Sequence, residues 1–100
     1  HLDLLETINR ETALRDAKEA ILHEYDLKGL VEDVSVTPGT PDVLMVRLKA
    51  AGGLSATDLT EKGAMLWELW AGYNRFNQVR PRRSAVELRD KDGTKLGLYH

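Results

Sequence analysis

Apolar residues follow helical spacing and then strand spacing, and this succession occurs twice along the chain. A helix-spaced segment ending near Tyr25 precedes two alternating runs on either side of Pro38-Gly39. A second helix-spaced segment, from Ser55 to about Phe76, precedes two more alternating runs around Asp92-Gly93. Helical spacing is typical of an amphipathic helix and alternation is typical of a half-buried strand. We therefore expect an α+β domain with the element order αββαββ.

This order predicts a two-layer sandwich, in which a four-stranded, mainly antiparallel sheet carries both helices on one face. In the first hairpin, pairing Val36 with Leu44 puts the apolar residues of both strands on the same face. The opposite face is then exposed and carries charged or small side chains. The residues expected there are Asp33, Ser35, Thr37, Val43, Met45, Arg47, Lys49, Glu87 and Arg89.

The second hairpin fixes its register through its turn. A three-residue connection with Gly93 in the left-handed region pairs Leu88 with Leu96 and Val86 with Leu98. All four apolar side chains then share one face. A two-residue turn would separate them onto opposite faces, so we predict the three-residue connection.

The first helix carries two apolar stripes that do not coincide. The stripe of Leu4, Leu5 and Ile8 is rotated by roughly 120° from the stripe that begins at Leu14. We therefore predict that residues 13–100 form a single α+β domain and that residues 1–12 are a helical lead-in or linker. This lead-in either packs on the sheet edge or joins the domain to an upstream domain or membrane anchor.

Composition excludes several classes of site. The 100 residues suffice for one domain, and there is no cysteine, which excludes disulfides and thiolate chemistry. The formal net charge is −2, with ten acidic and six basic residues in positions 1–50 but six acidic and eight basic in positions 51–100. No apolar run is long enough to span a bilayer.

The residues form no recognisable catalytic set. Glu19 and His23 share a helix face, but a metal site needs three or four ligands, so we expect a solvated histidine. The sequence 90–93 resembles part of a calcium loop but lacks the later glutamate. We therefore predict a noncatalytic protein with no metal and no cofactor.

Two features indicate contact with other molecules. Trp67 lies beside the buried stripe of the second helix, where it either anchors a protein contact or covers the groove between the helices. The connector 75–83 carries four arginines, namely Arg75, Arg80, Arg82 and Arg83. Clustered arginines bind phosphates, so nucleic acid is an alternative ligand.

A third hypothesis is a small-ligand pocket between sheet and helices, lined by Trp70 and Tyr73. Gly63 lies in the same helix, where glycine costs about 1 kcal/mol relative to alanine. We interpret Gly63 as a mark of close approach between the two helices.

The element order and the rhythm Gly29-Leu30-Val31-x-x-Val34-x-Val36 resemble the small extracytoplasmic modules of the ring-building and BON type. The likeness covers about residues 13–88. The added strand at 96–99 departs from the pattern of those modules. It implies a scaffold or assembly domain of a larger, membrane-anchored protein and carries over no site residues. We therefore expect an interaction or assembly module with a protein partner or self-association, with an extracytoplasmic location favoured over a cytoplasmic one.

Overall fold

The computed structural model describes residues 2–23, 29–37, 42–77 and 84–100. Its elements follow the predicted order αββαββ, with a short 3-10 turn before the second helix. In chain order they are α1 (Leu2–His23), β1 (Val31–Thr37), β2 (Asp42–Leu48), η1 (Ala51–Gly53), α2 (Ala56–Phe76), β3 (Ser84–Arg89) and β4 (Lys95–Tyr99).

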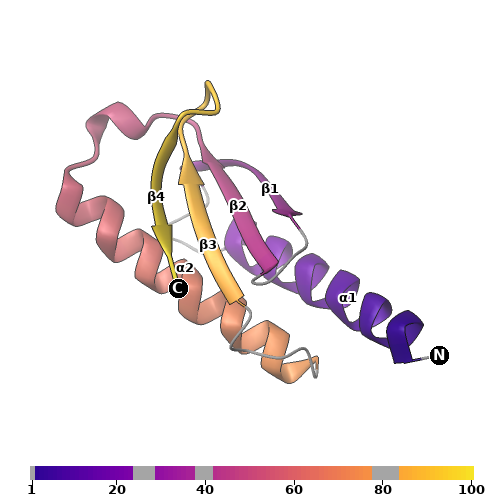
Figure 1. The fold of residues 1–100 in the computed structure, drawn as a ribbon. Helices are drawn as coiled ribbons and strands as arrows, with labels where there is room; N and C mark the ends of the chain where they lie inside the picture. Colours follow the sequence, from indigo (N-terminus) through magenta and orange to yellow (C-terminus); the bar gives the residue numbers. More distant parts are fainter. Residues whose placement is uncertain (1, 24–28, 38–41, 78–83) are drawn as a thin grey trace.

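The four strands form one sheet in the order β1-β2-β3-β4, and both helices lie on one face of it (Figure 1). The two hairpins are antiparallel, whereas β2 and β3 pair in parallel. Parallel neighbours need a crossover connection, and α2 provides it. The sheet is therefore mixed, with two of its three pairings antiparallel, and the predicted α+β sandwich is confirmed.

The core lies between the sheet and the two helices. The inward residues predicted for β2, Leu44, Val46 and Leu48, are all fully buried. On the helix side, α1 packs on β1 and on α2, while α2 packs on β3 and β4. The other large side chains buried in this layer are Ile21, Leu66, Trp70, Val86 and Leu88.

The two halves of α1 differ in burial. Ala13, Ala17 and Ile21 are completely buried, whereas Leu4 and Ile8 are 65% and 50% exposed. Figure 1 shows the N-terminal turns of α1 extending beyond the sheet, and the molecule is 46 Å long but only 24 Å and 21 Å in its other dimensions. Packing of α1 against the sheet layer is therefore concentrated in its second half.

The register of the first hairpin is the predicted one, since Val36 pairs with Leu44. An irregularity lies between Val31 and Asp33, where Glu32 is the extra residue. Such a bulge changes the alternation of faces, which explains why Val31 and Val34, three residues apart, are both buried.

The turn of the second hairpin is also the predicted one. Gly93 has a φ of 86°, in the left-handed region that favours glycine. Its N–H donates to the carbonyl of Asp90 at 2.9 Å, and the N–H of Asp90 donates to the carbonyl of Thr94 at 2.9 Å.

The strand register beyond this turn was predicted wrongly. Leu88 pairs with Gly97 rather than with Leu96, because the pairing shifts by one residue between Leu88 and Arg89. Leu96 is the extra residue of this bulge, and its side chain still packs against the core. A bulge thus accommodates a register that regular alternation excludes.

The same shift exchanges the faces of the last two residues of β4. Val86 pairs with Tyr99 rather than with Leu98 as predicted, so Tyr99 faces the helices. Leu98 pairs with Glu87 on the outer face and is 43% exposed. An aromatic ring buries more apolar area than a leucine side chain, which favours this arrangement.

The start of α2 is closed by a side-chain cap. The Ser55 hydroxyl accepts a hydrogen bond from the Asp58 N–H at 3.1 Å, and the Asp58 carboxylate accepts one from the Ser55 N–H at 3.2 Å. This reciprocal pair satisfies two backbone donors and places a negative charge at the positive end of the helix dipole.

Replacing Ser55 by alanine is expected to lower the free energy of unfolding by about 1 kcal/mol, because a donor of the first turn loses its acceptor. Urea denaturation followed by circular dichroism measures this change. Thr57→Ala, at an exposed position of the same turn, is the control. Equal losses in the two variants would contradict the capping role.

Candidate interaction surface

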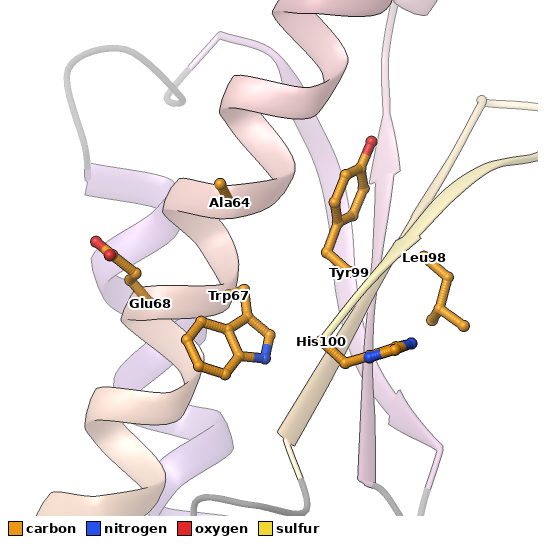
Figure 2. A pocket seen from close by; sticks show the side chains of 6 residues that line it. All are labelled: Ala64, Trp67, Glu68, Leu98, Tyr99 and His100. Carbon is orange, nitrogen blue, oxygen red and sulfur yellow. The ribbon is translucent and has the colours of Figure 1, made fainter.

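A groove lies between α2 and the end of the edge strand β4 (Figure 2). We call it the edge groove, and its volume is about 340 Å³. Three of its residues come from α2 and three from the C-terminal end of β4 and the residue after it. They are Ala64, Trp67, Glu68, Leu98, Tyr99 and His100.

Trp67 forms one wall of the edge groove and is held in place by a hydrogen bond. Its indole N–H donates to the carbonyl of Ser84, the first residue of β3, at 3.0 Å. The ring is half-buried and packs against the edge of the core. The indole is therefore a fixed apolar wall, and it contacts the sheet layer at β3.

Tyr99 lines the groove from β4, and two glycines make room for its ring. A Cβ added at Gly63 of α2 would overlap the ring, and one added at Gly97 would lie 2.7 Å from the hydroxyl oxygen. Gly63 therefore marks a close approach of α2 to a side chain of β4. The interpretation of Gly63 as a helix–helix contact was wrong.

The remaining lining residues set the chemistry of the rim. Glu68 is exposed and points away from β4, while Leu98 points to the side of β4 opposite α2 (Figure 2). Ala64 is also exposed and leaves the groove shallow on the helix side. The site is thus an apolar surface bordered by the carboxylate of Glu68 and the imidazole of His100.

The outer face of the sheet is a second exposed surface, and its charges are paired. Arg89 contacts Glu87 at 2.7 Å, and Arg47 lies 3.8 Å from both Glu32 and Asp33. The pairs of Arg47 are about half exposed and contribute little to stability, whereas the Glu87 side chain of the other pair is only 12% exposed. This face offers fewer apolar contacts than the edge groove does.

The proposed small-ligand residues are neighbours on α2 but differ in burial. Trp70 is 1% exposed and packs in the centre of the core. Tyr73 is half-buried and lines a shallow groove between the helices with Asp16, Glu19, Ala20 and His23. The prediction of a small-ligand pocket lined by these two residues stays a prediction.

The arginine connector is described only at its start. Arg75 is exposed in the last turn of α2, next to Phe76, which is 80% exposed. Arg80, Arg82 and Arg83 lie outside the described residues. The prediction that this connector binds nucleic acid therefore stays a prediction.

Within the described ranges, no group of three or more His, Asp or Glu side chains is placed to hold a metal ion. No helix in those ranges is both long enough and apolar enough to cross a bilayer.

Sequence reasoning found Trp67 but missed the residues that make it part of a groove. Tyr99, Leu98 and Ala64 are too far apart in sequence to be grouped by spacing alone. The one usable signal was Gly63, a glycine in the middle of a helix, because such a position often faces a large side chain. That Tyr99 is the residue packed against Gly63 follows only from the shifted register of β4.

Comparison with known protein-family models, with curated proteins and with solved structures found no match of any of the three kinds. The resemblance to ring-building and BON modules therefore stays a prediction.

Proposed function

We propose that this chain is a noncatalytic protein-interaction module that binds its partner at the edge groove. The observation that carries the proposal is a fixed indole on α2 and a tyrosine on β4 that line the same open, mainly apolar groove. Tryptophan and tyrosine are enriched among the residues that dominate binding energy at protein interfaces. Trp67 and Tyr99 are the two residues we assign this role.

The surroundings of the edge groove support the same assignment. Leu98, which borders the groove and is 43% exposed, extends the apolar area onto the outer face of the sheet. Such a groove would accept one apolar side chain of a partner, with polar residues of the partner around it at the rim. We expect the module to belong to a larger, membrane-anchored extracytoplasmic protein, as an assembly domain.

The proposal is tested by selecting displayed random peptides of about twelve residues on the wild-type domain. Affinities of the enriched peptides are then measured by fluorescence anisotropy. Ala64→Glu, which puts a long charged side chain into the groove from an exposed helix position, is expected to weaken binding at least about tenfold. Because glutamate is a good helix former, the fold should be retained.

A matched control is Ala20→Glu on α1, a half-buried alanine in the groove between the helices. It should leave affinity unchanged. Failure to enrich any peptide, or equal affinity of the wild type and Ala64→Glu, would overturn the proposed function.

A further inference from the structure

Each edge of the sheet is protected along only part of its length. At β1, the bulge at Glu32 interrupts the pairing, and the ion pair between Lys18 and Asp33 at 3.8 Å links the strand to α1. Bulges, charges and covering helices are the features by which natural sheets prevent unwanted strand pairing. The first half of the β1 edge is therefore protected, whereas from Val34 to Thr37 the strand runs in regular register with β2 and has no charged side chain.

The β4 edge is protected only in its first half. Lys95 and the bulge residue Leu96 lie there. From Gly97 to Tyr99 the strand runs in regular register with β3 and has no charged side chain. Within the described part of the chain, no strand lies on its other side.

The unprotected half of β4 is also the half that borders the edge groove. Leu98 and Tyr99 belong to both. In a strand added beside β4, alternate side chains would point to the helix side of the sheet. One of them would enter the groove between Trp67 and Tyr99, while backbone groups of the added strand would pair with β4.

The charges around the edge groove indicate which residues would flank that apolar side chain in the partner. Glu68 lines the groove, and Glu61, two turns earlier on α2, lies on the same flank of the helix. Both carboxylates are exposed. A lysine or arginine next to the apolar side chain would complement this acidic flank.

From these observations we infer that the partner is an extended protein segment that adds to β4 as a fifth strand. The segment carries one bulky apolar side chain in the edge groove and a lysine or arginine beside it. This inference rests on the proposed function and specifies how the same site is used.

The test uses the enriched peptides and variants of the full chain. Peptides methylated at single backbone amides should lose at least about tenfold in affinity at every second position and little at the positions between. Glu68→Lys should weaken binding about three- to tenfold at low salt, with the difference decreasing as salt is added. Glu19→Lys on α1 changes the net charge equally and should have no effect.

Other results would overturn the inference in distinguishable ways. Peptides that bind with uniform tolerance of methylation would refute strand addition but keep the interaction function. Enriched peptides that carry no lysine or arginine would refute the basic residue assigned to the partner segment. If light scattering over a dilution series gives a dimer that Leu98→Lys converts to a monomer, the edge accepts a second copy instead. If the protein is a monomer at all concentrations, the β4 edge is not occupied by a second copy, which supports binding of a separate segment.

Discussion

Replacing Trp70 by alanine is expected to lower the free energy of unfolding by about 3–5 kcal/mol, the largest loss we expect from one substitution. The Trp70 ring is 1% exposed and packs among residues of both helices and the sheet. Removing it leaves a cavity that the neighbouring side chains fill only in part. Because a domain of this size is stable by only about 5–15 kcal/mol, the variant should unfold at much lower urea concentration.

Trp67→Ala is the comparison that separates the two tryptophans. The half-buried Trp67 ring should cost less to remove, about 1–3 kcal/mol, part of it from the lost hydrogen bond to Ser84. Unfolding is followed by far-ultraviolet circular dichroism, since both substitutions alter the tryptophan fluorescence. A smaller loss for Trp70→Ala than for Trp67→Ala would contradict the assignment of Trp70 to the core.

Gly63→Ala is expected to lower the free energy of unfolding by about 2–3 kcal/mol, although alanine is the better helix former. The added methyl group overlaps the Tyr99 ring, so the ring or the whole of β4 has to move. Since Tyr99 is a wall of the edge groove, the same variant should also bind the selected peptides more weakly.

Gly72→Ala on the same helix is the matched control, because a Cβ at Gly72 meets no atom within 4 Å. There the gain in helix propensity should raise the free energy of unfolding by about 0.5–1 kcal/mol. Opposite signs in the two variants are the expected result. A stabilising Gly63→Ala would show that Tyr99 does not pack on α2.

The fold was predictable from sequence wherever the pattern was regular. The strict alternation of β2 and the helical spacing of α2 predicted the positions of both elements correctly. The pairing of β2 with β3 is parallel because α2 crosses over the sheet, which hairpin reasoning alone does not consider. Bulges caused the remaining error, since one extra residue at Leu96 reverses every later face of β4.

The candidate site was less predictable because it depends on that register. Trp67 could be identified as a tryptophan off the buried stripe. Its neighbours follow only when Tyr99 is known to face α2 and Leu98 to face outward. With regular alternation, Leu98 would face the helices and Tyr99 would face outward. The edge groove with Trp67 would then not be predicted.

The most direct test of the account is the mapping of amide chemical shifts in the isotope-labelled domain during titration with the strongest selected peptide. The account predicts that the largest changes fall at 97–100 in and after β4 and at 64–68 in α2. Largest changes at the exposed Leu4, Leu5 and Ile8 of α1, or around Arg75, would contradict the assignment of binding to the edge groove.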